Sequence, residues 1–330
     1  MFSISTITPV YKGEKYVSEL VEEIEIVRNN WNEKYEGLKL VESIFVIDDA
    51  SDKSLEILSK ISETKDWVHV IELSKNFGQH PATVSGILHS VGDWVVTLDE
   101  DLQHSPDYID ELILKALESN QDICYAKSID NTHNSFVRDK ISSLFKSIIA
   151  YLSGDKNIKK YNSYRVIRGN IARGAASIAG HGSYFDIVLS WFTSRSITHE
   201  IPMEDDRNQT GNGKSGYSVI QLIKHGKRMI MTSKVKFLRL GIIIGGIAFL
   251  ASILLSFYAI YARMNNAGAI ENQGWASQIL ATVFFGGLTI LLVGFVLESV
   301  SDILLTSKGK PNFFVVDRSS DTELKKILKK

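Results

Sequence analysis

Residues 92–103 of this chain, GDWVVTLDEDLQ, place a short apolar run directly before three consecutive acidic side chains. The run Trp94–Leu98 is rich in the β-branched and aromatic residues that are typical of a buried strand. Three earlier stretches repeat this order, in which a loop of polar residues follows an apolar run. They are Pro9–Glu14 after Ser3–Thr8, Asp48–Asp52 after Ser43–Ile47, and Ser74–Gln79 after Val68–Leu73. The pattern predicts that the informative side chains gather where the strands end.

Segments with a helical spacing of apolar residues alternate with these strands. They span 14–29, 52–62, 81–90 and 106–117, and a further strand is expected over Ile123–Ala126. Repeated strand–helix units predict an α/β fold with a mostly parallel sheet and helices on both of its faces. Ligands of such sheets bind at the carboxyl ends of the strands. One edge of the sheet should therefore carry the functional site.

Carboxylates from two of the strand ends, Asp48–Asp52 and Asp99–Asp101, would share that edge. Like charges that gather at one rim repel each other unless a cation or donor groups neutralise them. A divalent metal ion that also holds a diphosphate is the candidate we favour. Each segment also has a simpler interpretation, because an acidic triplet can be a solvated turn and Asp52 a helix cap. Their common position, each directly after a strand, favours a shared site.

The composition excludes several classes of protein. The 330 residues are 44% hydrophobic and 23% charged, which rules out wholesale disorder. The 37 Lys and Arg residues balance 38 Asp and Glu residues, so the net charge of -1 offers no case for a nucleic-acid partner. The single cysteine, Cys124, excludes an intrachain disulfide and a CxxC-type zinc site.

The C-terminal part of the chain differs from the rest in its hydropathy. Leu240–Ala262 contains no charged residue, and neither does 272–297, whose apolar body starts at about Ile279. Each stretch is long enough to cross a bilayer core as a helix, and the flanking Lys and Arg residues place both ends in the cytoplasm. The predicted organisation is a cytoplasmic domain over 1–235 with a juxtamembrane basic segment at 224–239, transmembrane helices at 240–262 and 276–298, and a cytoplasmic tail over 299–330.

Together these segments resemble glycosyltransferase family 2, whose members are inverting enzymes with a GT-A fold, and in particular its polyprenyl-phosphate sugar synthases of the bacterial two-span type. The family's proline-x-tyrosine-asparagine-glutamate pattern appears as Pro9–Glu14, with one extra residue and no asparagine. Its DD-x-S-x-D pattern is similar to Asp48–Asp52, DDASD, in which the last aspartate follows the serine directly, and its (R/K)-N-x-G pattern is Lys75–Gly78. The aspartate-x-aspartate-leucine-glutamine pattern is Asp99–Gln103, and Lys308–Pro311 after the second span also looks like the bacterial members.

The resemblance implies a membrane enzyme that transfers a hexose-type sugar, with inversion, from a nucleotide-diphosphate sugar to a polyprenyl phosphate. A UDP-sugar and undecaprenyl phosphate are favoured. The reaction would take place at the cytoplasmic face of a bacterial inner membrane and supply a lipid-linked sugar for cell-surface glycan modification. It also implies Mg²⁺ or Mn²⁺ as the cofactor and a homo-oligomer, with no nucleic-acid partner.

The resemblance also implies roles for individual residues. The catalytic residues would be Asp99, Asp101 and Arg165, and the metal ligands Asp99, Asp101 and Gln103. The nucleotide sugar would contact Pro9, Tyr11, Glu14, Asp48, Asp49, Lys75, Phe77, Gly78 and Asp99. The acceptor phosphate would contact Arg138, Arg165, Arg207, Lys214 and Ser215. Arginine suits this role because its guanidinium fork matches phosphate oxygens in bidentate geometry.

One departure from the family matters. Several relatives carry an aspartate two or three residues before the arginine that corresponds to Arg165, where this chain has Asn162 and Ser163. A carboxylate role at that place is therefore not carried over. Two other functions stay open: a family 2 transferase that acts on a glycan acceptor, and an inactive, membrane-tethered binder of nucleotide sugars. Having only two spans disfavours the first, and the intact acidic triplet disfavours the second.

Overall fold

The computed structural model describes residues 1–49, 51–129, 156–180, 183–202, 238–265, 275–309 and 320–329. Its sheet has seven strands in the order β3-β2-β1-β4-β6-β5-β7. The strands are β1 (Phe2–Val10), β2 (Leu38–Ile47), β3 (Val68–Glu72), β4 (Trp94–Thr97), β5 (Ile123–Ser128), β6 (Arg165–Arg168) and β7 (Ser196–Ile201). The helices are α1 (Val17–Lys34), α2 (Ser54–Thr64), α3 (Gln79–His89), α4 (Ile109–Glu118), α6 (Gly169–Ile178), α7 (Phe185–Phe192), α9 (Leu238–Asn265), α10 (Trp275–Ser307) and α11 (Asp321–Leu328), with 3-10 turns η1 (Pro106–Tyr108) and η2 (Lys156–Lys160).

The predicted α/β fold with a largely parallel sheet is confirmed. Strand β1 pairs in parallel with β2 on one side and β4 on the other, and β3 adds to β2 in parallel. Strand β6 runs antiparallel between β4 and β5, and β7 pairs in parallel with β5. The antiparallel strand places the residues before Arg165 beside the end of β4, because Thr97 is the register partner of Arg165.

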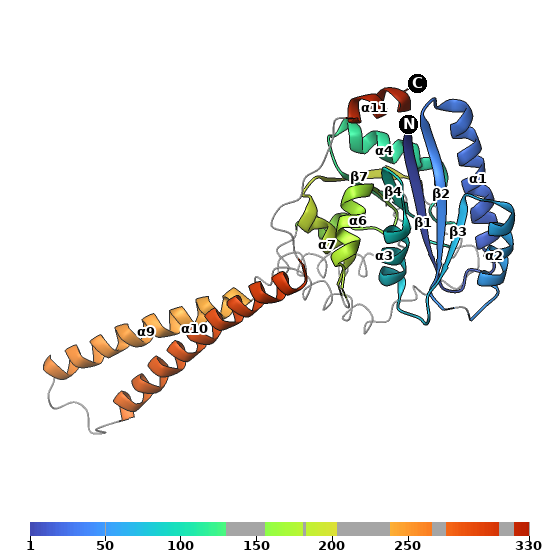
Figure 1. Ribbon diagram of the computed structural model, residues 1–330. Coiled ribbons are helices and arrows are strands. Elements are labelled where there is room, and N and C mark those ends of the chain that lie inside the picture. The colour runs from blue at the N-terminus through green and yellow to red at the C-terminus, as the bar shows by residue number, and fades with distance from the viewer. Residues whose placement is uncertain are drawn as a thin grey trace.

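Two apolar cores lie on opposite faces of the sheet, because side chains alternate along each strand. Phe45 on β2 packs into a core with residues of α1, α2, α4 and α11. Its neighbours Ile44 and Val46 face a second core with residues of α3, α6 and α7. Figure 1 shows these helices arranged around the central strands. The layers leave the strand ends as the place where side chains from several elements can meet.

The predicted strands and helices are recovered with shifted ends. Strand β2 begins at Leu38, five residues before the predicted start at Ser43. Helix α1 begins at Val17 and not at Glu14. The elements β6, α6, α7 and β7 follow the last predicted strand and were not predicted. A four-residue strand such as β6, with sequence RVIR, is too short to show a periodic pattern.

Helix α11 returns to the domain near the C-terminal end of the chain. Its side chains Leu324 and Leu328 are buried in the same core as α1 and α4. Asp321 forms an ion pair with Arg168 at the end of β6, and Arg168 also pairs with Asp122 at a nitrogen–oxygen distance of 2.9 Å. The predicted cytoplasmic tail therefore includes a helix that belongs to the core of the domain.

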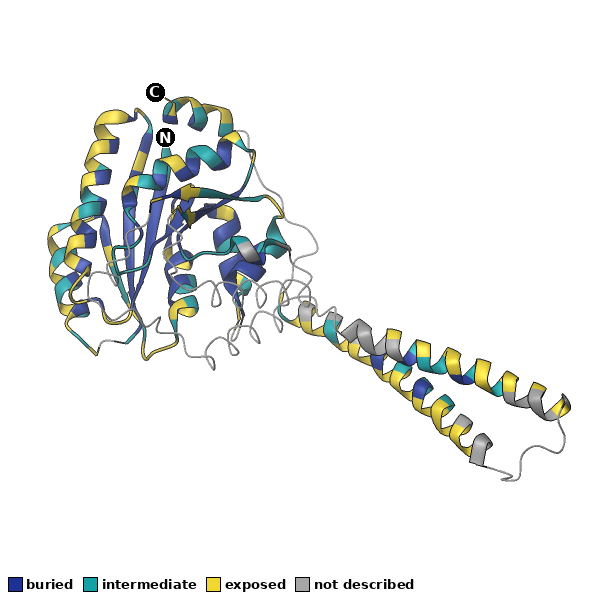
Figure 2. Cartoon of the chain, turned by 180° about the vertical axis from the view of Figure 1, so that it is seen from behind, coloured by how far each residue is buried: buried dark blue, intermediate teal, exposed yellow. Residues whose placement is uncertain are grey.

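Helices α9 and α10 lie side by side and project from the domain (Figure 1). Their backbones approach closely at two glycines: a Cβ built on Gly245 would lie 2.5 Å from the Leu291 nitrogen, and one built on Gly287 would lie 2.8 Å from the Phe249 nitrogen. Figure 2 shows that most of the described residues on this pair are exposed. Among the described residues, no helix meets the length and hydropathy required of a membrane span. The transmembrane helices predicted at 240–262 and 276–298 are therefore not confirmed.

Candidate active site at the strand ends

The order of the strands brings the four predicted segments to one edge of the sheet. In the parallel register, Val10 pairs with Ile47 and Ile47 pairs with Glu72, while Ile7 pairs with Thr97. The loops that follow β1, β2, β3 and β4 therefore leave the sheet from neighbouring strands in the same direction. We call these four loops the strand-end rim: residues 11–16, 48–53, 73–78 and 98–105, of which Ala50 is not described. The prediction that the four segments lie at one edge of the sheet is therefore confirmed.

Asp48 connects two loops of the rim. Its buried carboxylate accepts hydrogen bonds from the backbone N–H groups of Phe77 at 2.6 Å and Gly78 at 2.7 Å. Gly78 has a φ of 95°, a conformation that a glycine adopts at little cost. The carboxylate therefore shapes the 73–78 loop. A contact from Asp48 to the base or ribose of a nucleotide stays a prediction.

Two aromatic rings on the rim are open to solvent. Tyr11 is 43% exposed and Phe77 is 47% exposed. The ammonium groups of Lys12 and Lys75 lie 5.2 Å and 5.1 Å from the centres of these two rings, within the range of cation–π contacts. Exposed aromatic faces flanked by cations can stack on a nucleobase while the lysines attract phosphate. The predicted nucleotide residues Tyr11, Lys75 and Phe77 thus lie where a ligand can reach them.

Pro9 and Asp49 sit at the bases of their loops. Pro9 is a buried residue of β1 and pairs with Val46 of β2. Asp49 has a φ of 102°, a left-handed conformation that is uncommon for any residue other than glycine. Residues in such conformations cluster at functional sites, where the surrounding structure holds them in place. Both positions are compatible with the predicted nucleotide site.

The loop after β1 is connected to the loop after β2 by two reciprocal hydrogen bonds. The backbone N–H of Glu14 donates to the Asp52 carboxylate at 3.1 Å, and the Glu14 carboxylate accepts from the backbone N–H of Lys53 at 3.2 Å. Asp52 also accepts from the backbone N–H of Ser54 at the start of α2. Because the Asp52 carboxylate accepts this hydrogen bond at the first turn of α2, the alternative interpretation of Asp52 as a helix cap is supported.

Asp99, the first carboxylate after β4, accepts hydrogen bonds at both oxygens. The Gln79 side chain donates to Oδ1 and the Ser163 hydroxyl donates to Oδ2, each at 2.7 Å. The Asp99 backbone N–H donates to Nδ1 of the buried His104 at 3.1 Å. Asp99 is therefore held in one orientation by three surrounding residues.

Asp101 has a different environment, although it lies only two residues further on. Its partly buried carboxylate accepts from the backbone N–H of Gln103 at 3.4 Å, a long hydrogen bond. Among the residues that the structure describes, no group of three or more His, Cys, Asp and Glu side chains is arranged to hold a metal ion. The donor types still fit, because carboxylate and amide oxygens are the ligands that Mg²⁺ and Mn²⁺ prefer. Metal binding by Asp99, Asp101 and Gln103 stays a prediction.

Glu100, the central residue of the acidic triplet, turns toward the loop after β1. Its Oε2 accepts a hydrogen bond from the backbone N–H of Tyr11 at 3.0 Å. Burial raises the pKa of the Glu100 carboxyl to about 7, although the backbone N–H groups of Tyr11 and Lys12 act to lower it. The nearby carboxylates of Asp101 and Asp52 raise this pKa further.

Arg165 lies inside the domain. Its side chain is 4% exposed. The guanidinium forms an ion pair with the buried carboxylate of Asp186 and lies 5.2 Å from the centre of the Phe185 ring. Asp186 also accepts a hydrogen bond from the Tyr125 hydroxyl at 3.0 Å. Truncating one partner of such a buried pair is strongly destabilising. In this arrangement Arg165 has a structural role, and its predicted contact with an acceptor phosphate stays a prediction.

The other predicted acceptor residues, Arg138, Arg207, Lys214 and Ser215, lie outside the described residues. Four residues that contact the site were not predicted: Gln79, Glu100, His104 and Ser163. Gln79 and Glu100 lie within or beside the quoted segments, so their position in the chain was a usable signal. The position of Ser163 depends on the antiparallel strand β6, which the sequence does not reveal.

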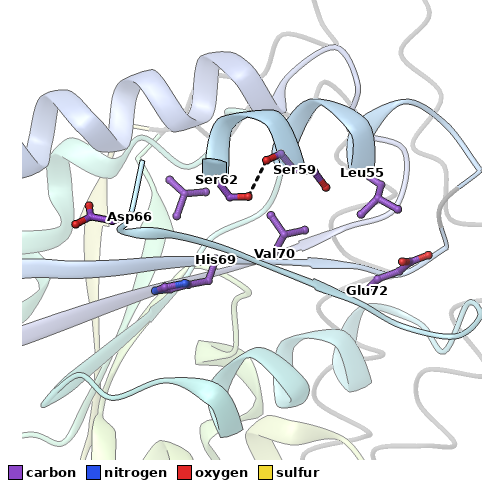
Figure 3. A pocket seen from close by; sticks show the side chains of 8 residues that line it. Leu55, Ser59, Ser62, Asp66, His69, Val70 and Glu72 are labelled. Carbon is purple, nitrogen blue, oxygen red and sulfur yellow. Dashed lines mark hydrogen bonds between the residues drawn. The ribbon is translucent and has the colours of Figure 1, made fainter. Parts of the chain in front are cut away.

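A separate pocket of about 490 Å³ lies away from the rim residues, between α2 and the edge strand β3. Figure 3 shows side chains of both elements around it, including Leu55, Ser59 and Val70. None of the predicted site residues lines this pocket.

Two curated proteins and one solved structure illustrate what this chain is similar to. An uncharacterized glycosyltransferase YkcC of Bacillus subtilis (strain 168) is 25% identical over 327 residues, which cover 98% of this chain and 96% of that protein. An undecaprenyl-phosphate 4-deoxy-4-formamido-L-arabinose transferase of Proteus mirabilis (strain HI4320) is 27% identical over 319 residues, which cover 94% of this chain and 92% of that protein. A crystal structure of glucosyl-3-phosphoglycerate synthase from Mycobacterium tuberculosis, in complex with Mn²⁺, uridine diphosphate and phosphoglyceric acid, aligns with 12% identity and a TM-score of 0.45 over 70% of this chain and 77% of that chain.

The family assignment depends on a match that covers the strand-end rim. The model of the family described as glycosyl transferase family 2 matches residues 5–176, slightly more than half of the chain. The matched range includes most of β1, all of β2 to β6, and all four loops of the rim. The chain therefore belongs to glycosyl transferase family 2 and is a glycosyltransferase.

Proposed function

We propose that this glycosyltransferase moves a hexose-type sugar from a nucleotide-diphosphate sugar to a polyprenyl phosphate, with a UDP-sugar and undecaprenyl phosphate as the favoured pair. The observation that carries the proposal is the strand-end rim. There the carboxylates of the acidic triplet lie beside two exposed aromatic rings and their lysines. Relatives named undecaprenyl-phosphate 4-deoxy-4-formamido-L-arabinose transferases, which are 25% to 27% identical to this chain, support the choice of acceptor.

The proposed reaction is a single displacement with inversion. An oxygen of the acceptor phosphate attacks the anomeric carbon of the sugar from the face opposite the diphosphate. The bond from that carbon to the diphosphate oxygen breaks, and the nucleoside diphosphate leaves with the bonding electron pair. A phosphate monoester has a second pKa of about 6, so much of the acceptor is already dianionic at neutral pH. A general base is therefore less necessary than for a hydroxyl acceptor.

The lower need for a general base is consistent with residues 162 and 163, the positions at which the resemblance to the family led us to look for an aspartate. Here Ser163 donates to Asp99, and the Asn162 side chain donates to the backbone carbonyl of Ala126 at 2.8 Å. Neither side chain can act as a carboxylate base. A phosphate acceptor does not require one, whereas a sugar hydroxyl would be assisted by one.

Mg²⁺ or Mn²⁺ bound by Asp101, with Asp99 and Gln103 beside it, would neutralise the charge that the leaving diphosphate gains. The Asp99 carboxylate is firmly oriented because Gln79 and Ser163 hold both of its oxygens. Tyr11 and Phe77 would stack against the base, and Lys75 would attract the phosphates. The role of the chain is then to orient the donor and to hold negative charge where a cation can offset it.

We also propose that α9 and α10 form a membrane hairpin that keeps the rim near the lipid acceptor, on the cytoplasmic side of a bacterial inner membrane. The exposed apolar side chains of the pair support this placement. Leu254 is 70% exposed, Phe257 67% and Phe285 64%. Large exposed apolar patches mark sites that contact membranes or other proteins. Homo-oligomerisation stays a prediction.

Incubation of the full chain in detergent with undecaprenyl phosphate and radiolabelled UDP- or GDP-sugars tests the transfer. We expect label to enter the organic-extractable lipid only when the lipid phosphate is present. Label that enters a water-soluble glycan instead would identify the glycan-acceptor alternative. Binding of the sugar nucleotide without any turnover would identify the inactive binder.

Labelling with a membrane-impermeant thiol reagent tests the topology in intact cells. A cysteine introduced at Asn266, between the two helices, should be labelled from outside, whereas Lys326→Cys on α11 should not. The native Cys124 is 0% exposed and adds little background. The reverse pattern of labelling would contradict the cytoplasmic placement of the domain.

A further inference from the structure

We propose that Glu100 is a positioning residue that clamps the loop of residues 11–16 to the acidic segment after β4. This loop carries the predicted nucleotide residues Tyr11 and Glu14. The kinetic part of the proposal rests on the proposed function, whereas the structural part does not. No role was predicted for Glu100, since only its two aspartate neighbours were expected to take part in the chemistry.

The contact between Glu100 and the loop is specific in its geometry. The Oε2 atom accepts from the backbone N–H of Tyr11 at 3.0 Å, so the carboxylate contacts the backbone of the loop. Hydrogen bonds that backbone N–H groups donate to an ionised carboxylate are among the stronger hydrogen bonds in proteins. Glu100 is only partly buried, so water can compete for this carboxylate when the loop moves away.

Gly13 leaves the space that Glu100 occupies. A Cβ built on Gly13 would lie 2.5 Å from Oε2 of Glu100 and 2.9 Å from Cγ1 of Val17. Any other residue at position 13 would force one of these groups to shift. Gly13 belongs to the Pro9–Glu14 segment, in which the chain has one residue more than the family pattern. The packing of Gly13 against Glu100 therefore connects this longer loop to the central residue of the acidic triplet.

The loop is held on its other side by the hydrogen bonds between Glu14, Asp52 and Lys53. These bonds attach the loop to the segment after β2 and not to the segment after β4. On the side of the acidic triplet, the backbone N–H groups of Tyr11 and Lys12 attach the loop to the Glu100 carboxylate. Loss of this carboxylate should leave the loop attached at Glu14 and released at Tyr11.

Limited proteolysis of the full chain tests the clamp without any need for activity. Trypsin can cut after the exposed residues Lys12 and Lys15, and mass spectrometry of the peptides reports the rate at each site. We expect Glu100→Ala to raise the rate of cleavage at these two sites by about tenfold, because loops that open more often are cut faster. Glu100→Gln keeps an oxygen that can accept from Tyr11, so its rate should stay within about twofold of the parent.

Glu56→Ala is the matched control, since Glu56 is an exposed glutamate on α2 that pairs with Lys60. It should leave cleavage at Lys12 and Lys15 unchanged. The Gly13→Ala variant should resemble Glu100→Ala, because its methyl group displaces the carboxylate. Cleavage of Glu100→Ala at the parental rate would overturn the clamp, and so would a Glu100→Gln variant that is cut as fast as Glu100→Ala.

The kinetic readout then assigns the clamp to donor binding. In Glu100→Ala we expect the KM for the nucleotide sugar to rise about tenfold and the KM for the lipid phosphate to stay within about twofold. A rise in both constants, or a fall in kcat alone, would overturn this assignment. If the parent protein transfers no sugar, the proposed function fails, while the proteolysis result still decides whether Glu100 holds the loop.

Discussion

Asp99 and Asp101 are separated by one residue and flank Glu100 in the acidic triplet. The Asp99 carboxylate accepts hydrogen bonds from Gln79 and Ser163, one at each oxygen. The Asp101 carboxylate accepts a long hydrogen bond from the backbone N–H of Gln103. Because the resemblance to family 2 makes Asp101 a metal ligand, we expect metal-dependent transfer to depend on this carboxylate.

The Asp101→Asn variant should reduce turnover about a hundredfold or more. It removes a negative charge that would help to bind the metal ion, and the metal ion would offset the charge that the leaving diphosphate gains. EDTA should abolish transfer by the parent protein, and Mg²⁺ or Mn²⁺ should restore it. The measurement is the initial rate of lipid labelling at saturating metal. Asp107→Asn, at an exposed acid on the nearby η1, serves as the control. Full activity of the parent in excess chelator would remove the metal from the proposal.

Cys124 offers a test of the core at the level of one residue. Burial raises the pKa of its thiol to about 12. At pH 8 the folded protein therefore holds the unreactive thiol, and only a rise toward pH 12 would produce the reactive thiolate. We expect no reaction with a coloured disulfide reagent at pH 8 in the native state, and one equivalent of reaction after unfolding in urea. Rapid labelling of the native protein would show that β5 is not buried as described.

At the residue scale, the sequence identified the loops of the site more successfully than it identified the contacts of their side chains. The nucleotide contact expected of Asp48 stays a prediction, whereas the hydrogen bonds by which its carboxylate holds the backbone of the 73–78 loop were not predicted. No role was predicted for His104, which is buried beside Asp99 and stacked on Tyr164. These contacts join residues far apart in the sequence or depend on rotamers, and neither feature leaves a periodic pattern.

At the scale of elements, the strand and helix pattern was informative up to β5 and then failed. Residues 2–128 alternate regularly, so the hydrophobic period identifies each element. Strand β6 breaks this order because it enters between β4 and β5 in the antiparallel direction. Its four residues include an arginine at each end, and both arginines are buried only because Asp186 and Asp122 pair with them. The neutralisation of these buried arginine charges cannot be recognised in the sequence before their acidic partners are known.

The packing of α9 against α10 predicts different effects of alanine at the adjacent glycines Gly286 and Gly287. Gly287→Ala should weaken the packing of α9 on α10, since its Cβ would lie 2.8 Å from the Phe249 backbone nitrogen. Overpacking of this kind costs about 1 to 3 kcal/mol. Gly286→Ala has nothing within 4 Å of the new Cβ and should be neutral or slightly stabilising. Hydrogen exchange measured by mass spectrometry on peptides of α9 and α10 reads out the difference. Equal protection in both variants would contradict the close crossing at Gly287.

At the scale of the whole molecule, α11 makes the C-terminal part of the chain necessary for the stability of the domain. Leu324→Ala should lower the free energy of unfolding by about 2 to 5 kcal/mol, the usual range for a leucine removed from a core. Thr322→Ala, an exposed neighbour on the same helix, should have little effect. Urea unfolding followed by tryptophan fluorescence is suitable because Trp31 and Trp94 lie in the same core. Equal midpoints for the two variants would mean that α11 does not stabilise the domain.

The position of α11 has a consequence for the order of events during protein synthesis. The ribosome releases the hairpin before it releases α11, because residues 238–307 precede residues 321–328 in the chain. The nascent domain therefore exposes the apolar surface that Leu324 and Leu328 later cover until both hairpin helices have emerged. If these helices insert into a bilayer as they are made, the last step of domain folding takes place on a protein already anchored there. A chaperone that protects this surface would be needed only for the interval between the two events.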